Sequence, residues 1–325
     1  MLRRALITGG AGFVGQWLAR ALMARGCAVT SVSHAAHPAH RVLDAGEFSQ
    51  VRWIAGDVRD GEQLERVVAD ERPDVIFHLA GISYVPAATE SPVLAYEINV
   101  LGCACLLGVV RRLRATDGYD PVVLVVGSGE QYGRHEAGEL PLTEAAEQRP
   151  LTVYAATKAA QEVVALQAAR GDGLRVIATR SFNHSGPGHA PHFLLPALVA
   201  RASALPRCGG QLALGNDFVT RDYLHVADVV EAYVRLVERG VPGEAYNVCS
   251  GSGVTVRSLA EHVLQRLGIT AEIVTDPALV RPVDVPVLIG SPAKVQSATG
   301  WHPRHSREAI VDDLIRSVGN SNASS

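Results

Sequence analysis

Short apolar runs alternate with amphipathic stretches of helical length through the first 180 residues of the chain. The runs are ALIT (5–8), CAVTSV (27–32), VRWIAGD (51–57), DVIFHLAG (74–81), PVVLVVG (121–127) and LRVIATR (174–180). Between them, helices are predicted over Phe13–Arg25, Gly61–Asp70, Pro92–Arg114 and Tyr154–Arg170. Strands joined by spacers of helical length form parallel βαβ units. The pattern therefore predicts an α/β fold with a Rossmann-type doubly wound parallel sheet.

The pattern becomes less regular after Arg180, where SFNHSGPGHAPHF (181–193) has the composition of a loop. Further helices are predicted over 193–204, 226–238 and 256–267. We expect a smaller, interleaved α/β lobe that binds substrate over the carboxyl ends of the strands, where open α/β sheets bind ligands. The predicted division is a Rossmann domain over 1–180 to which 221–250 returns, a substrate lobe over 181–220 and 251–318, and a disordered tail over 319–325.

A glycine-rich turn, Gly9-x-x-Gly12-x-x-Gly15, follows the first strand and opens the first helix. Gly9 suits the tight turn, Gly12 allows the backbone to approach a pyrophosphate, and Gly15 allows close packing of helix on strand. Phe13 and Val14 contribute amides at the helix start. This turn in this context predicts a dinucleotide site.

Later strand ends fit the same cofactor. Asp57, at the end of the third strand, could accept a hydrogen bond from an adenine amino group, and Val58 follows it. Leu79, Ala80 and Gly81 end the fourth strand with small residues, which suits contact with the ribose and nicotinamide. Alternatively, Asp57 is only a residue of the turn after the strand.

The end of the second strand bears on cofactor choice. NAD enzymes tend to place an acid there, which binds the ribose 2′-hydroxyl. This strand ends in Ser33 and His34, with no acid before Asp44. Since a carboxylate would repel a 2′-phosphate and these side chains would not, NADP(H) is favoured, with NAD(H) as the alternative.

Ser128, Tyr154 and Lys158 form the candidate catalytic group. Tyr154 and Lys158 are four residues apart, on one face of a predicted helix. A free tyrosine titrates near pH ~10, and a nearby ammonium would lower that pKa. Ser128 ends the strand before this helix and could hold a substrate oxygen. The group predicts proton transfer to a carbonyl oxygen during hydride reduction.

The composition excludes several classes of protein. A net charge of −3 argues against a general affinity for nucleic acid or anionic membranes. No run approaches the roughly 18 apolar residues of a membrane span. The five cysteines have no metal-ligand spacing, so no metal is expected and we expect buried, reduced thiols. A cytoplasmic protein is predicted.

The motifs TGGAGFVG, AGDVRD, HLAG, GSGEQYG, YAATK and RDYLHVADVVEAY follow one another along the chain. In this order they resemble the extended short-chain dehydrogenase/reductase family over essentially the whole chain. The second half, through RSFNHSGPGH, AYNVCSGSG, RPVDVPVLIGS and ATGWHPR, is most similar to members that reduce GDP-4-keto-6-deoxy-D-mannose to GDP-D-rhamnose. The resemblance thus implies a GDP-linked 4-keto-6-deoxyhexose as substrate.

The same resemblance implies roles for three residues of the second half. Asn183 would bind the phosphates of the sugar nucleotide. Arg221 and Arg281 would clamp its diphosphate, which suits the bidentate geometry of guanidinium. The alternative for each arginine is a structural ion pair, for example of Arg221 with Asp222 or Asp228.

Other functions remain open at this stage. Glu130 lies where dehydratases of the family carry a glutamate that takes a proton from the sugar, so it is a candidate substrate-binding and catalytic residue, and GDP-mannose 4,6-dehydratase is the nearest alternative. Gly129, which lacks the neighbouring polar side chain of that pattern, argues against it. A nucleotide-sugar 4-epimerase and a non-catalytic nucleotide-sensing Rossmann protein are further alternatives.

Two predicted helices are more apolar than surface helices need to be. One contains the run NVLGCACLLGVV (99–110), and the other, which contains Tyr154, is rich in alanine with Val163 and Val164. The corresponding helices of the resembling family pair in a dimer, so we expect a homodimer. Burial within the monomer is the alternative.

Overall fold

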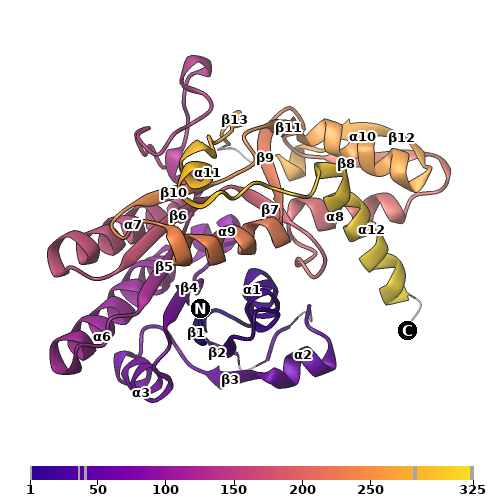
Figure 1. The fold of residues 1–325 in the computed structure, drawn as a ribbon. Helices are drawn as coiled ribbons and strands as arrows, with labels where there is room; N and C mark the ends of the chain where they lie inside the picture. The colour runs from indigo at the N-terminus through magenta and orange to yellow at the C-terminus, as the bar shows by residue number, and fades with distance from the viewer. Residues whose placement is uncertain (1, 36, 40–41, 281–283, 323–325) are drawn as a thin grey trace.

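The computed structural model describes residues 2–35, 37–39, 42–280 and 284–322. Its main sheet has seven parallel strands in the order β10-β6-β5-β4-β1-β2-β3 (Figure 1). The strands are β1 (Arg4–Thr8), β2 (Ala28–Ser33), β3 (Val51–Ala55), β4 (Val75–His78), β5 (Val122–Ser128), β6 (Val176–Ser181) and β10 (Ala245–Val248). This confirms the predicted doubly wound α/β fold.

Helices cover both faces of the main sheet because successive side chains of each strand point to opposite faces. Ile7 and Phe77 pack on the first face, while Leu6 and Ile76 pack on the second. The first face carries α1 (Phe13–Met23), α9 (Val226–Arg239) and α11 (Ala293–Thr299). The second carries α3 (Gly61–Glu71), α6 (Gly102–Asp117) and α7 (Val153–Asp172).

A second group of elements lies beyond the carboxyl ends of β5 and β6 (Figure 1). β9 (Thr220–His225) pairs with β7 (Asn183–Ser185), β11 (Gly253–Thr255) and β13 (Val287–Leu288), and β8 (Cys208–Leu214) pairs with β12 (Thr270–Thr275). α8 (Leu194–Ser203), α10 (Val256–Leu267) and α12 (Arg307–Asn322) share an apolar core with them. The exact division into two lobes stays a prediction.

The chain passes between the two groups more than once. The second group is called the small lobe below. After β9 in this lobe, α9 packs against α1 and β10 pairs with β6 in the main sheet. The chain then returns to the small lobe through β11 and α10. The shorter elements are α2 (Ala45–Gln50), α4 (Val85–Glu90), α5 (Pro92–Tyr96), η1 (Glu97–Leu101), η2 (Gly129–Tyr132), η3 (Ala137–Glu139) and η4 (Pro277–Leu279).

Three details differ from expectation. α12 continues to Asn322, so residues 319–322 of the predicted disordered tail are helical, since extending an anchored helix costs little per residue. Cys208 is exposed on β8, unlike the buried Cys27, Cys103 and Cys249. Within the described residues, the joined helix Pro92–Asp117 is long and apolar enough to span a membrane, although 44% of its most apolar window is buried. It packs as a core helix against α3 and α7.

Candidate active site

A cavity of about 1290 Å³ opens at the carboxyl ends of the main-sheet strands and is lined by both lobes. Within the described chain, all the predicted site residues line it: Gly9, Gly12, Phe13, Val14, Gly15, Ser33, His34, Asp57, Val58, Leu79, Ala80, Gly81, Ser128, Glu130, Tyr154, Lys158, Asn183 and Arg221. Arg281 lies outside the described residues. Strand ends of a parallel sheet meet at one edge, which is why residues so distant in sequence converge here.

The glycine turn forms one end of the cavity. Gly9 has a φ of +75°, and its N–H donates to the Val32 carbonyl at 2.7 Å. A Cβ on Gly15 would lie 2.5 Å from Gly10 Cα, so helix and turn are in direct contact. Gly12 is the N-cap residue of α1, and because glycine has no side chain, no side-chain cap occupies the first amides of the helix. These amides are the ones that bind a pyrophosphate in such folds. The residues present therefore fit a dinucleotide.

The second and third strands line the adjoining part of the cavity. The Ser33 hydroxyl accepts a hydrogen bond from Ala11 N–H at 3.0 Å, so it supports the glycine turn. His34 is exposed. Asp57 forms an ion pair with Arg59 at 2.6 Å, and hydrogen bonds from Arg59 hold the pKa of that carboxyl below its usual range. Arg59, which the sequence analysis missed, also pairs with Glu97 at 2.7 Å.

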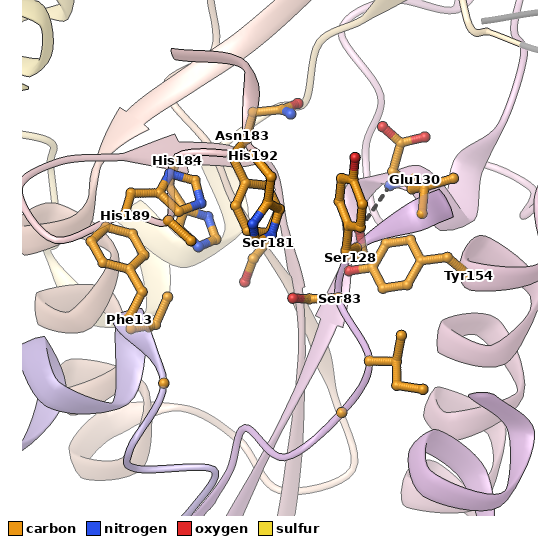
Figure 2. Close-up of a pocket in the computed structure, with 18 of the residues that line it drawn as sticks. Phe13, Ser83, Ser128, Glu130, Tyr154, Ser181, Asn183, His184, His189 and His192 are labelled. Atoms are coloured by element: carbon orange, nitrogen blue, oxygen red, sulfur yellow. Dashed lines mark hydrogen bonds between the residues drawn. The ribbon is translucent and has the colours of Figure 1, made fainter. Parts of the chain in front are cut away.

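The side chains of Ser128 and Tyr154 lie side by side in the cavity lining (Figure 2). Burial raises the pKa of Tyr154 to about 12; the neighbouring Ser128 hydroxyl acts against this, while the charge of Glu130 acts in the same direction. The phenol is therefore protonated at neutral pH, which suits a proton donor. Ser128 Oγ also accepts from Glu130 N–H at 3.2 Å.

The expectation that Lys158 lowers the pKa of Tyr154 is not met in this arrangement. Lys158 Nζ donates to the Val126 carbonyl and to Gln161 Oε1, each at 2.9 Å. Burial lowers the pKa of Lys158 itself to about 8. The effect of burial on Tyr154 thus exceeds any effect of the ammonium.

Asn99 is a polar residue of this region that the sequence analysis missed. It lies in the π-helical turn η1, and its Oδ1 accepts from Ile82 N–H at 2.8 Å while its Nδ2 donates to Thr157 Oγ1 at 2.8 Å. A Cβ on Gly81 would lie 2.8 Å from Asn99 Oδ1 and 3.4 Å from Lys158 Nζ. The sequence signal that could have identified Asn99 is its position as a lone polar residue in the apolar run 99–110.

Asn183 and Arg221 enter the cavity from β7 and β9 of the small lobe. Arg221 forms a buried ion pair with Asp284 and donates to the Val285 carbonyl at 2.6 Å. The structural ion pair left open by the sequence therefore forms, with a partner that was not considered.

The two partners named for Arg221 from the sequence are wrong. Asp222 accepts instead from the backbone N–H groups of Ser250 and Gly251, at 2.8 and 2.9 Å. Asp228 bonds His305 at 3.0 Å. Asp222 and Arg221 point in opposite directions because they are successive residues of β9, whereas Asp228 lies on α9.

Further cavity residues come from the histidine-rich segment 181–193, which includes β7 and the loop that follows it. His189 stacks between Phe13 and Phe193, with ring centroids 4.5 and 4.2 Å apart, so the loop contacts the start of α1. His192 meets Tyr84 edge to face at 4.7 Å. Figure 2 shows additional polar side chains around the same space: Ser83, Ser181 and His184. Within the described residues, no three potential metal ligands cluster.

A dinucleotide turn facing a Ser–Tyr–Lys group on a doubly wound sheet defines an extended short-chain dehydrogenase/reductase, a class of NAD(P)-dependent oxidoreductases. More narrowly, the chain belongs to the GDP-mannose 4,6 dehydratase family, whose model matches residues 6–314.

Its relatives include several nucleotide-sugar enzymes. GDP-6-deoxy-D-mannose reductase of Pseudomonas aeruginosa is 38% identical over 250 residues, which are 75% of this chain and 81% of the relative. UDP-glucose 4-epimerase of Azospirillum brasilense is 29% identical over 97% of this chain and 90% of the relative. Among solved structures, RMD from P. aeruginosa complexed with NADPH has a TM-score of 0.81 and 31% identity, covering 98% of this chain and 99% of that one. The NAD complex of Thermus thermophilus UDP-glucose 4-epimerase has a TM-score of 0.85 and 29% identity, covering 98% and 99%.

Proposed function

We propose that this enzyme reduces the 4-keto group of GDP-4-keto-6-deoxy-D-mannose to give GDP-D-rhamnose, with NADPH as the reductant. The observation that carries the proposal is that Ser128, Tyr154 and Lys158 line one cavity together with the glycine turn and residues of the small lobe. The relatives support a role in GDP-sugar reduction or dehydration, and the relative at 38% identity favours reduction.

The residues of the cavity have complementary tasks in this reaction. When bound, the reduced nicotinamide supplies the hydride that the carbonyl carbon accepts. Tyr154 donates its phenolic proton to the carbonyl oxygen, which becomes the new hydroxyl group. Ser128 holds that oxygen within reach of Tyr154, and Lys158 contributes positive charge beneath the site. The glycine turn would hold the pyrophosphate of the cofactor.

The surroundings of Glu130 favour reduction over dehydration. A Cβ on Gly129 would lie 3.0 to 3.1 Å from three ring carbons of Phe182. A polar side chain next to Glu130, as in the dehydratase pattern, would therefore require this buried ring to shift by a few tenths of an ångström. Glu130 itself lines the cavity near Tyr154, and this is the observation that keeps dehydration as the second candidate.

The proposal is tested by adding GDP-4-keto-6-deoxymannose to the enzyme with NADPH and following absorbance of the reduced cofactor. We expect stoichiometric oxidation of NADPH, with NMR of the product fixing the configuration at C4 as rhamnose rather than 6-deoxytalose. Formation of a 4-keto sugar from GDP-mannose without added cofactor would instead establish the dehydratase. Interconversion of C4 epimers would indicate an epimerase, and binding without turnover of any of these sugars would indicate a sensing protein.

The same assay with NADH in parallel tests cofactor preference. Neither Ser33 nor His34 carries a carboxylate that would repel a 2′-phosphate, and Arg59 lines the same part of the cavity. These features support NADPH. Equal kcat/KM with NADH would show that the second strand does not discriminate.

We also propose that the enzyme is a homodimer. Val93 and Leu101, before α6, and Val163 on α7 are 71%, 55% and 67% exposed, so the two helical segments carry apolar surface that the monomer leaves in water. Pairing with the same surface of a second copy would bury it. Sedimentation should give twice the 34.5 kDa chain mass, and Val163→Glu should give the monomer. A monomeric wild-type enzyme would contradict the proposal.

A cytoplasmic location stays a prediction.

A further inference from the structure

A buried chain of hydrogen bonds runs beneath Ser128, on the side away from the cavity. The Ser128 backbone N–H donates to Gln131 Oε1 at 2.7 Å. The amide nitrogen of Gln131 donates in turn to Glu162 Oε2 at 3.0 Å. Gln131 is fully buried and Glu162 is 4% exposed. The position of the Ser128 backbone is therefore linked to a charged group in the interior.

Glu162 is itself held from several directions. Arg180 binds it through two nitrogens, at 2.7 and 2.9 Å, and Gln148 donates to its Oε1 at 2.7 Å. Arg180 also donates to the Tyr132 hydroxyl at 2.9 Å. Burial of such an ion pair costs desolvation that its attraction often fails to recover, so the pair is weak evidence for a stabilising role. Its geometric effect is definite, because it fixes the carboxylate that Gln131 contacts.

This network connects the two elements that carry the candidate catalytic group. Tyr154, Lys158 and Glu162 are spaced by four residues along α7 and share one side of the helix. Gln131 spans from Glu162 on that helix to Ser128 at the end of β5. Because Gln131 does not line the cavity, it acts on the reaction through the residues to which it is hydrogen-bonded, of which Ser128 is the one in the cavity lining.

We propose that Gln131, held by Glu162 and Arg180, is a positioning residue that sets the distance and direction of Ser128 relative to Tyr154 during carbonyl reduction. The inference rests on the proposed function, because its kinetic test measures the proposed reduction. It predicts that loss of the link misplaces the Ser128 hydroxyl and slows the chemical step, while the glycine turn and the small lobe bind their ligands as before.

Gln131→Met removes both hydrogen bonds at nearly constant side-chain volume. We expect kcat to fall by about 10- to 100-fold, as small misplacements of catalytic groups do, with KM for NADPH and for the sugar nucleotide within about twofold. Tyr132→Phe is the matched control, because it removes a hydroxyl from the far side of the same network. It should lower the melting temperature but keep kcat within about twofold of wild type.

Gln131→Glu provides a rescue that depends on pH. The protonated carboxyl can accept from Ser128 N–H and donate to Glu162 as the amide does, whereas its ionised form faces a second carboxylate. Burial and Glu162 should raise the pKa of the new carboxyl, so kcat relative to wild type should be high at low pH and fall as pH rises through that pKa. The titratable and charged groups on the elements packed around residue 131, which would also affect the pKa of the new carboxyl, are Glu130, Tyr132, Glu144, Tyr154, Lys158, Glu162 and Arg180.

Two results would overturn the proposal. One is a loss of kcat in Tyr132→Phe as large as in Gln131→Met, since that would show a structural role of the whole network. The other is a crystal structure of Gln131→Met in which Ser128 Oγ keeps its wild-type distance from the Tyr154 hydroxyl. The crystal structures need no substrate, so a wild-type enzyme that fails to reduce the GDP-linked sugar would refute the proposed function and still leave the positioning role tested.

Discussion

Tyr154→Phe should lower turnover by about 10²- to 10⁴-fold, the range attributed to positioned proton transfer. The phenol is buried and protonated, and it lines the cavity together with Ser128. Phenylalanine keeps the ring contacts with Ala88, Ala95 and Val153 and removes only the proton donor. Affinity for NADPH should therefore stay within about twofold of wild type, as removal of a group used only in the transition state requires.

The measurement combines steady-state oxidation of NADPH with a fluorescence titration of cofactor binding. Tyr119→Phe is a matched control, because the Tyr119 hydroxyl also has a partly buried hydrogen bond, to the Pro73 carbonyl at 2.7 Å, but lies outside the cavity lining. That variant should turn over like wild type. A wild-type rate in Tyr154→Phe would remove Tyr154 from the mechanism.

Gly9→Ala should weaken binding of NADPH by at least about 100-fold, which corresponds to about 2.8 kcal/mol. At φ +75° an added Cβ would lie 2.8 Å from Ala80 N and 2.9 Å from Ala80 Cα. These are backbone atoms, so the glycine turn and the end of β4 must separate. Both segments line the cofactor end of the cavity, and their separation would disrupt the contacts with the dinucleotide.

Gly26→Ala separates the cost of the left-handed backbone conformation from the cost of the close contact with Ala80. Gly26 has nearly the same φ, +74°, but nothing lies within 4 Å of its Cβ position. It should lose only the roughly 1–2 kcal/mol of stability that a left-handed conformation costs. Isothermal titration with NADPH and thermal unfolding of both variants make the comparison. Unchanged NADPH affinity in Gly9→Ala would show that this turn does not hold the cofactor.

The main sheet was predictable because its central strands, such as β4 and β5, are apolar runs buried on both faces and are joined by connections of helical length. The glycine turn was predictable because its spacing reports a local backbone requirement at Gly9 and Gly15. Those signals are contained within a few consecutive residues.

Long-range pairings had no such signal. Asp284 is 63 residues from Arg221 in the sequence. Whether Arg221 pairs with Asp284 or with Asp222 depends on how β9 and β13 pair in the folded protein. The direction of the Lys158 ammonium depends on the Val126 carbonyl, which the packing of α7 on β5 sets. The net pKa of Tyr154 depends on depth of burial, a property of the assembled fold rather than of the Tyr–Lys spacing.

The repeated passage of the chain between its two lobes limits how this enzyme can be divided or recombined. A fragment ending at residue 180 would lack β10, leaving β6 as an unpaired sheet edge, and would lack α9, leaving the apolar side of α1 uncovered. Such a fragment would tend to aggregate. Exchange of whole lobes between relatives would meet the same obstacle. New sugar-nucleotide specificities are therefore more accessible through replacement of the loops above the sheet than through shuffling of gene segments.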